Sequence, residues 1–219
     1  MGTFLLSIGD QMDKVFYAFD MKAFELFGNI QSPLMTTVAK FFTFFGDGKF
    51  VILLMITGIG LCLFKKTRQY GIVLLFSIII GTLITNVFLK PTIMRIRPYI
   101  TLSDISEFKS WWMDAGSPSV SDYSFPSGHT TAAFESATAL FLSLRKKNKI
   151  AYLFPVIAAG TMLSRVYLMV HYATDVIGGL AVGILAGTIG YLLAKAFMQI
   201  IQNTKLNHFD MKSVIKRRN

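Results

Sequence analysis

The residues best suited to chemistry lie in a short polar stretch, residues 164–175, which closes an otherwise apolar segment. This stretch contains three ionisable side chains, Arg165, His171 and Asp175. An ionisable side chain at membrane depth costs roughly 2.5–3.5 kcal/mol on insertion scales, so such residues need partners and often mark a functional site. His171 and Asp175 are four residues apart, which places both on one face of a helix if the helix continues through them.

The chemistry that these three residues favour is transfer of a phosphoryl group. The Asp175 carboxylate can hold one imidazole nitrogen of His171 as N–H, which leaves the other nitrogen free to attack. Arg165 carries a planar, permanently charged fork of donors that suits phosphate oxygens. The alternative is a structural arrangement in which Arg165 pairs with Asp175 and His171 lies at the membrane interface. These residues alone do not separate the two interpretations.

A second stretch adds positive charge. Residues 90–98 place Lys90, Arg95 and Arg97 directly after an apolar run. Cations at the end of a membrane span can serve as topology signals or as ligands for an anion. Lys90 and Arg97 belong to the proposed site, whereas the sequence assigns no role to Arg95.

A third stretch, residues 125–130, precedes the next apolar run and reads Phe-Pro-Ser-Gly-His-Thr. Pro126 is suited to the start of a helix, which puts Ser127, Gly128 and His129 in the first turn. Backbone N–H groups in a first turn have no partners within the helix, and they point outward toward a possible anion. The stretch therefore predicts an anion site, with Ser127 as a hydrogen-bond donor rather than a nucleophile.

Together the three stretches resemble the three-part signature of the type 2 phosphatidic acid phosphatase family, which also includes bacterial acid phosphatases and vanadium haloperoxidases. The resemblance covers residues from about 45 to 195, and the matching positions are Lys90, Arg97, Pro98, Pro126, Ser127, Gly128, His129, Ser164, Arg165, His171 and Asp175. It implies that His171, oriented by Asp175, attacks phosphorus. It also implies that His129 protonates the leaving oxygen and later activates water. The phosphate would be bound by Lys90, Arg97, Ser127, Gly128 and Arg165.

Composition identifies the class of protein. The chain has 219 residues, of which 53% are hydrophobic and 16% are charged, and its mean hydropathy is +0.53. These values are typical of an integral membrane protein. The net charge of +10 does not indicate nucleic acid, because the basic residues gather at the ends of apolar runs. We expect no cofactor and no metal, since two histidines without a carboxylate cluster make a poor site for a hard cation.

The apolar runs predict an all-α membrane helix bundle with five to six transmembrane helices and an N-terminal interfacial helix. Each predicted span is near the length that crosses about 30 Å at 1.5 Å per residue. The five clear spans are 49–64, 70–89, 127–144, 150–170 and 175–195. They define three parts, an N-terminal interfacial segment 1–45, a membrane core 46–198 and a basic tail 199–219. The N-terminal segment shows no signal-peptide pattern and holds one amphipathic helix or two.

Charge in the connections predicts orientation. Basic residues follow the first, third and last spans, and by the positive-inside rule those ends face the cytoplasm. All three signature stretches then lie on the extracytoplasmic side. The long connection 90–125 carries Trp111 and Trp112, and we expect it to form a lid at headgroup level. The alternative is a mobile tether that lets two signature stretches meet.

Several residues outside the signature have simpler expectations. Gly179, Gly183 and Gly187 form a small-residue stripe suited to close packing of helices within the bundle. Glu135 lies about 9 Å deeper than His129 at helical rise. It can be a neutral buried acid, a partner for Arg165 or a proton relay. The single cysteine, Cys62, and the tail residue His208 have no expected role in chemistry.

These observations predict a metal-independent lipid phosphatase of the cell membrane, with a phosphohistidine intermediate. The expected substrate is a lipid phosphate or diphosphate in the outer leaflet. The resemblance favours undecaprenyl diphosphate, with phosphatidylglycerol phosphate or phosphatidic acid as alternatives. An anionic lipid transporter or flippase is the alternative of another class, but the chain shows no internal repeat and its charged set lies at one face. The sequence does not indicate an oligomeric state.

Overall fold

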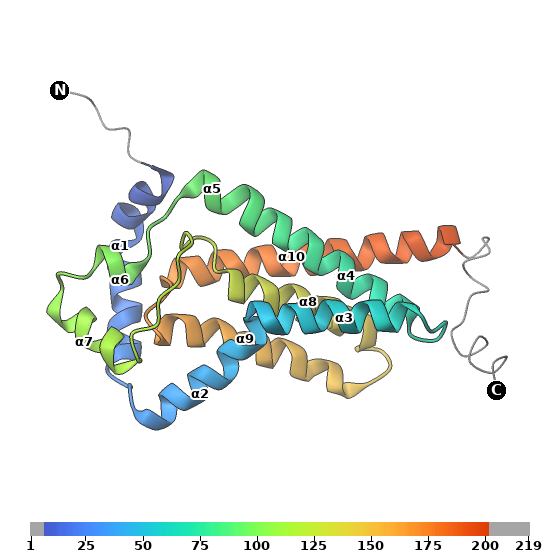
Figure 1. Ribbon diagram of the computed structural model, residues 1–219, viewed down its shortest axis with the longest axis horizontal. Helices are drawn as coiled ribbons and strands as arrows, with labels where there is room; N and C mark the ends of the chain where they lie inside the picture. The colour runs from blue at the N-terminus through green and yellow to red at the C-terminus, as the bar shows by residue number, and fades with distance from the viewer. Residues whose placement is uncertain (1–6, 202–219) are drawn as a thin grey trace.

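Long helices packed side by side make up most of the structure. The computed structural model describes residues 7–201, and every regular element in that part of the chain is helical. The helices that run along the long axis are α3 (Gly48–Cys62), α4 (Arg68–Thr82), α8 (Gly128–Leu144), α9 (Leu153–Tyr167) and α10 (Ala173–Ile201) (Figure 1). α10 packs against α8 and α4, while α3 packs against α4 and α9 packs against α8. The predicted all-α membrane bundle is confirmed.

Length and polarity of these helices fit a membrane. Within the described residues, three helical segments are long and apolar enough to cross one, Arg68–Thr101, Lys149–Tyr167 and Ala173–Ile201. A fourth span results if Pro33–Gly46 and Gly48–Cys62, which meet at a bend of 42°, are counted together. α8 has 17 residues and runs beside α10 and α9. A helix is therefore present at each of the five predicted spans.

The N-terminal part begins with α1 (Ile8–Gly28), which crosses the end of the bundle instead of following its long axis (Figure 1). A capping box starts this helix, since Asp10 N–H donates to Ser7 Oγ at 3.1 Å and Ser7 N–H donates to the Asp10 carboxylate at 2.9 Å. α2 (Pro33–Thr43) follows and packs along α9. The segment predicted as one interfacial helix or two thus holds one crossing helix and a second that joins the bundle.

The long connection after α4 contains short helices and is not an extended tether. α4 continues through a π-helical turn, Leu83–Leu89, into the short helix α5 (Lys90–Ile93). Two more short helices follow, α6 (Pro98–Thr101) and α7 (Ser106–Asp114). Trp111 was expected to be an interfacial anchor, but it is 9% exposed and packs in a cluster with Phe24 of α1 and Phe108. Trp112 stacks on Tyr99 with ring centroids 5.5 Å apart.

Small residues on α10 bring that helix close to α8. A Cβ at Gly183 would lie 2.6 Å from Phe134 Cβ, and a Cβ at Gly187 would lie 2.6 Å from Thr138 Cβ. Neither distance is tolerable, so the helices can approach this closely only because both positions are glycine. The predicted role of this stripe in internal packing is confirmed. Gly179 continues this contact to the start of α8, because a Cβ there would lie 2.7 Å from the Ser127 carbonyl oxygen.

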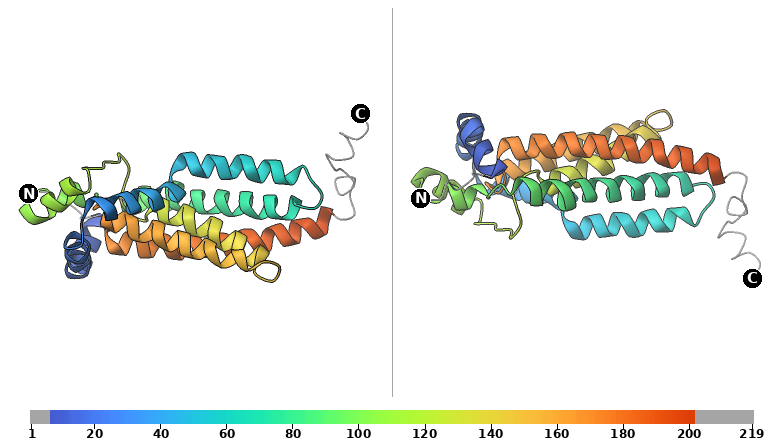
Figure 2. Two further views of the ribbon diagram at one scale, coloured as in Figure 1. Left: turned by 90° about the horizontal axis from the view of Figure 1, so that it is seen from below. Right: turned by 90° about the horizontal axis from the view of Figure 1, so that it is seen from above.

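The two ends of the bundle differ in character (Figure 2). One end holds α1, α5, α6 and α7, together with the start of α8 and the end of α9. The opposite end holds the basic connections 63–67 and 145–149 and the end of α10. From residue 202 onward the predicted tail 199–219, including His208, lies outside the described residues.

We predict that the end with α7 faces the outside of the cell. In a Cys62→Ala background, a cysteine replacing the exposed Ser110 of α7 should react with a membrane-impermeant thiol reagent in intact cells. A cysteine replacing the exposed Asn148, at the opposite end, is the matched control and should react only after the cells are opened. Labelling of the Asn148 variant alone in intact cells would reverse the orientation.

Candidate active site

The central pair of the site is formed by His171 and Asp175, but not on one continuous helix. α9 ends at Tyr167, Met169 has a φ of 57°, and α10 begins at Ala173, so His171 lies in the link between the two helices. The condition for a shared helix face, a helix that continues through both residues, is therefore not met. The two residues meet because Asp175, in the first turn of α10, reaches back to His171, with Oδ2 3.3 Å from Nδ1.

Asp175 is fully buried and is satisfied from several directions. Its Oδ2 accepts from the Tyr172 backbone N–H at 3.0 Å, and it also accepts a hydrogen bond from the Ser124 hydroxyl. Its Oδ1 accepts from Arg95 Nη1 at 2.7 Å. Asp175 therefore pairs with Arg95 and not with Arg165, and the alternative of a structural pair between Arg165 and Asp175 does not hold.

His171 is 1% exposed, and its two nitrogens have different partners. Nδ1 lies beside Asp175, while Nε2 is 3.1 Å from Arg97 Nη1. Burial, followed by the positive charges of Arg97, Arg165 and Lys90, lowers the pKa of His171 well below its usual value. The imidazole is therefore neutral, with its proton on Nδ1 facing the carboxylate and its lone pair on Nε2. A neutral Nε2 is the form that can attack phosphorus.

Two buried cations hold a carboxylate at the mouth of the site. Lys90 and Arg97 are 7% and 3% exposed, and both pair with the carboxylate of Asp122, which is about half exposed. Arg97 Nε also donates to the Asp122 backbone carbonyl at 2.8 Å. Partial burial alone would raise the pKa of Asp122, but Lys90 and Arg97 lower it to about 2. Lys90 and Arg97, here called the cation cradle, thus already hold an anion. The sequence assigned no role to this anion, Asp122.

Arg165 has an unsatisfied donor. Its side chain is buried, and Nη1 donates to Thr43 Oγ1 at 2.6 Å. Its Nε is buried and has no hydrogen-bond partner in the described part of the chain. A buried charged donor without an acceptor is costly, and such groups often face a ligand.

The first turn of α8 begins one residue later than expected. Ser127 is the N-cap and Gly128 is the first helical residue, so Pro126 precedes the cap instead of opening the helix. The Ser127 hydroxyl accepts from Thr130 Oγ1 at 3.0 Å, and its backbone N–H donates to the Asp175 carbonyl at 3.0 Å. Ser127 is therefore occupied with protein partners, and only its hydroxyl hydrogen remains for a ligand. A Cβ on Gly128 would lie 3.6 Å from Lys90 Nζ, so this turn borders the cation cradle.

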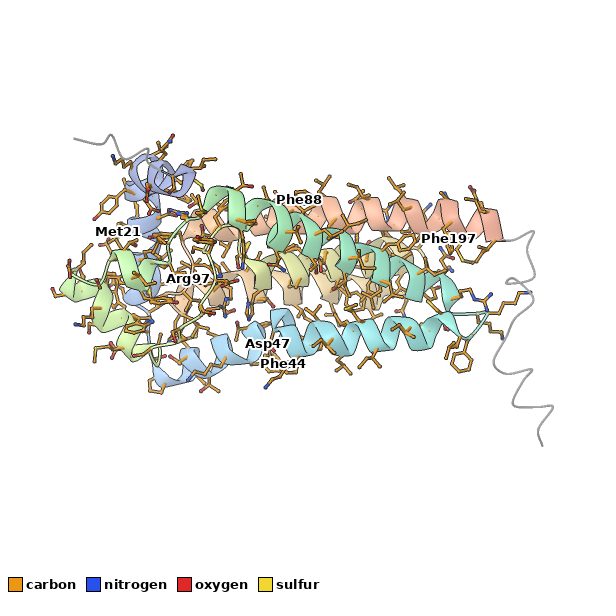
Figure 3. All side chains as sticks on the ribbon, turned by 45° about the horizontal axis from the view of Figure 1, so that its top comes forward. Met21, Phe44, Asp47, Phe88, Arg97 and Phe197 are labelled. Carbon is orange, nitrogen blue, oxygen red and sulfur yellow. The ribbon has the colours of Figure 1, made fainter. Side chains whose placement is uncertain are left out.

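His129 lies on the wall of the same cavity and is about one quarter exposed at its side chain. Its Nε2 is 4.0 Å from Asp47 Oδ2. Asp47 is the N-cap of α3, and it is labelled near Arg97 in the same end of the bundle (Figure 3). No sequence pattern connects Asp47 with His129, since they are far apart in the chain.

A cavity of about 460 Å³ joins these groups. It lies between α3, α4 with its π-helical turn, and α8, and its lining includes His129, His171, Lys90, Arg97 and Asp122. Arg165 does not line this cavity in the structure, although it was expected at the site. A second cavity of about 680 Å³ lies on the outer side of the cation cradle and also reaches Lys90, Arg97 and Asp122.

Arg95, like Asp122, is a residue near the site that sequence reasoning missed. Its side chain is completely buried and pairs with Asp13 at 2.7 Å, Asp20 at 2.8 Å and Asp175 at 2.7 Å. Its guanidinium also lies 3.7 Å from the centroid of the Tyr172 ring. Asp13 and Asp20, seven residues apart on α1, share one helix face, and that spacing was the available signal. Arg95 thus connects the crossing helix to the catalytic carboxylate candidate.

Within residues 7–201, no group of three or more His, Cys, Asp and Glu side chains is arranged to hold a metal ion. The positive charges near His171 come instead from Lys90, Arg97 and Arg165. Metal independence remains a prediction, and every activity assay below includes excess chelator to test it.

Comparison with known proteins places this site in a family. Residues 70–199 match the model of the PAP2 superfamily. The chain is 34% identical to phosphatidylglycerophosphatase B of Bacillus subtilis over 184 residues, which cover 79% of this chain and 80% of the relative. It is 31% identical to the undecaprenyl-diphosphatase of Sulfolobus acidocaldarius over 123 residues, covering 56% of this chain and 54% of the relative.

A solved structure supports the same family. The crystal structure of a transmembrane PAP2 type phosphatidylglycerolphosphate phosphatase from Bacillus subtilis superimposes with a TM-score of 0.66 at 27% identity, covering 90% of this chain and 94% of that one. The chain therefore belongs to the PAP2 superfamily. It is a multi-pass membrane enzyme of the phosphatase class.

Replacing Arg95 should destabilise the protein. Arg95→Met leaves three carboxylates without their shared cation, and breaking a buried ion pair in this way costs about 3–5 kcal/mol. We expect a lower thermal unfolding midpoint in detergent, together with loss of activity. Lys14→Met, which removes an exposed cation of α1, is the control and should unfold like the wild type. Equal midpoints for the two variants would contradict the role of Arg95 as a structural centre.

Replacing Asp122 should make the cradle more available to other anions. Asp122→Asn removes the negative charge that competes for Lys90 and Arg97, so orthovanadate should inhibit at a concentration roughly fivefold lower, equivalent to about 1 kcal/mol. Ser121→Ala, in the adjacent exposed position, is the control and should not change the inhibition constant. An unchanged or weaker inhibition of the Asp122→Asn variant would mean that its carboxylate does not occupy the anion site.

Proposed function

We propose that this protein hydrolyses a lipid phosphate or diphosphate at the extracytoplasmic face of the cell membrane, through a phosphohistidine at His171. The observation that carries the proposal is the pairing of a neutral, buried His171 with Asp175 on one nitrogen and with the cation cradle on the other. The signature resemblance and the family membership support the same assignment. The orientation rests on the basic connections at the far end of the bundle.

Binding of the substrate begins with an exchange of anions. The phosphate displaces the Asp122 carboxylate from Lys90 and Arg97. Arg165, whose Nε has no partner within residues 7–201, turns toward the cavity to donate to the same phosphate. As Arg97 turns toward the phosphate, Nε2 of His171 is released from its contact with Nη1. The backbone N–H groups in the first turn of α8, which begins at Gly128, add donors to the same oxygens. Such fixed charges and dipoles supply most of the catalysis in phosphoryl transfer.

The chemical steps then follow from the positions of the two histidines. Nε2 of His171 forms a bond to phosphorus, and the bond from phosphorus to the lipid oxygen breaks. His129 gives a proton to that oxygen, so the lipid leaves as a neutral alcohol or as a shorter phosphate. His129 then takes a proton from water, whose oxygen attacks phosphorus and breaks the N–P bond. Asp175 stabilises the positive charge that develops on His171.

The identity of the lipid has two candidates. Undecaprenyl diphosphate is the prediction from the sequence, and the similarity to an undecaprenyl-diphosphatase supports it. Phosphatidylglycerol phosphate is the second candidate, because the similarity to phosphatidylglycerophosphatase B extends over 79% of the chain. The first experiment is therefore release of inorganic phosphate by the purified protein from both lipids, in excess chelator. Release from neither lipid would contradict the proposal, and activity that requires added metal would contradict the metal-free mechanism.

The two histidines should differ in the step that each one serves. His171→Ala should abolish turnover and covalent phosphorylation, because no nucleophile remains. With an activated substrate whose leaving group needs no proton, His129→Ala should still transfer phosphate to His171 and then release it slowly, because the base that activates water is missing. Acid quenching would destroy the label, so the phosphoenzyme is trapped in base.

His208→Ala is the control for the histidine variants and should keep wild-type turnover, since this residue belongs to the tail. Base-stable, acid-labile label on the His129 variant and none on the His171 variant is the expected pattern. Label on the His171 variant instead would exchange the two roles.

A further inference from the structure

A buried carboxyl group lines the active-site cavity and has no role in the steps above. Glu135 lies on α8, six residues beyond His129 and so about 9 Å deeper along the helix. It is 1% exposed, and its buried Oε2 has no hydrogen-bond partner among the residues that the structure describes. An ionised carboxylate in this position would be uncompensated at membrane depth, so Glu135 carries a proton. Within residues 7–201, no acceptor or donor is paired with Oε2 of this protonated carboxyl group.

The carboxyl group of Glu135 packs closely against α4 at the edge of the cavity. A Cβ at Gly81 of α4 would lie 1.5 Å from Glu135 Oε2, so only glycine at position 81 allows the carboxyl group to lie there. Thr85 donates to Thr131 at 3.2 Å at the next level toward the outside. Gly81, Thr85, Thr131 and Glu135 all line the cavity that contains His129 and His171. The polar side chains of Thr85, Thr131 and Glu135 therefore extend from the two histidines deeper into the bundle.

The other wall of the cavity is apolar. It is formed by Val51, Ile52 and Met55 of α3, and Ile52 is 58% exposed on the outer surface of the bundle. In the proposed mechanism, His129 gives a proton to the lipid oxygen that leaves phosphorus, so this oxygen must lie beside His129. The lipid atoms next to that oxygen then lie in the same cavity. A substrate here meets an apolar wall on α3 and a hydrogen-bond donor on α8.

The two candidate lipids differ in what they offer to that donor. A polyprenyl chain is a pure hydrocarbon and leaves the O–H of Glu135 unsatisfied. A glycerol-based lipid phosphate carries acyl ester carbonyls one glycerol unit beyond its phosphate, and a carbonyl oxygen is an acceptor. A site with a buried donor discriminates strongly against an analogue that lacks the acceptor, because the donor is then left unpaired.

We propose that Glu135 determines specificity by donating a hydrogen bond to an acyl ester carbonyl of a glycerol-based lipid phosphate. This inference rests on the proposed phosphatase function, and it selects the glycerophospholipid class over the polyprenyl class. Glu135 then acts on binding of the lipid and not on transfer of the phosphoryl group. Its loss should raise KM far more than it lowers kcat.

The test compares lipids that differ only in the carbonyl group. The substrates are dioleoyl phosphatidic acid, its ether-linked dialkyl analogue without carbonyls, and a polyprenyl phosphate. The enzymes are the full-length wild type, Glu135→Gln, which keeps a donor, and Glu135→Leu, which does not. We expect the wild type to prefer the ester lipid over the ether lipid by about tenfold in kcat/KM.

The variants should change that preference in a defined way. Glu135→Leu should bring the ratio of ester to ether close to one, through a higher KM for the ester lipid, and should not weaken activity on the polyprenyl phosphate. Glu135→Gln should keep the preference for the ester lipid. A ratio near one in the wild type, or an equal ratio in the wild type and Glu135→Leu, overturns the proposal. If Glu135→Leu does not fold, the wild-type ratio and Glu135→Gln still decide. If the wild type hydrolyses none of the lipids, the phosphatase function itself fails, which is a different result.

Discussion

The structure depends on one buried carboxylate, Asp175. Its two oxygens are shared among Arg95, Ser124, the Tyr172 backbone and His171, so it is compensated in charge before it acts on the imidazole. A buried carboxylate without such partners would take up a proton, and it could then no longer hold His171 in the required tautomer. The carbonyl of Asp175 also accepts from Ser127, which connects the first turn of α8 to the same residue. Asp175 therefore helps to position both His171 and the first turn of α8, which carries His129.

Near Asp175, the cations Lys90 and Arg97 need an anionic partner, both with and without a bound substrate. Without substrate, the cations Lys90 and Arg97 are neutralised by Asp122, a residue of the surface connection. A bound phosphate would provide the same neutralisation and free the carboxylate to return to solvent. Buried cations are costly when unpaired. In the proposed exchange, Lys90 and Arg97 would have an anionic partner both before and after the substrate binds.

Sequence patterns predicted the architecture well because membrane spans and helical glycine stripes are local signals. Each of the five predicted spans contains a helix, and Gly183 and Gly187 pack where their spacing placed them. The signature also marked Lys90, Arg97, His129, His171 and Asp175, which the structure brings to one end of the bundle. The sequence left open whether one helix runs through His171 and Asp175, because α9 ends at Tyr167 and the tight turn at Met169 contains no Pro or Gly. Arg95 and Asp122 were missed because their partners are remote in sequence or belong to a connection whose path no periodicity describes.

The cavity has two kinds of wall, and this division has a consequence for how such proteins diversify. The wall formed by α8 is held against α10 by close glycine contacts, and it carries His129. The wall formed by α3 packs mainly on α4, and it presents Val51, Ile52 and Met55 to the bound lipid. Substitutions on α3 therefore alter the shape available to a lipid tail without displacing a histidine. In an evolving lineage, new lipid preferences can accumulate on this one helix while the reaction stays the same.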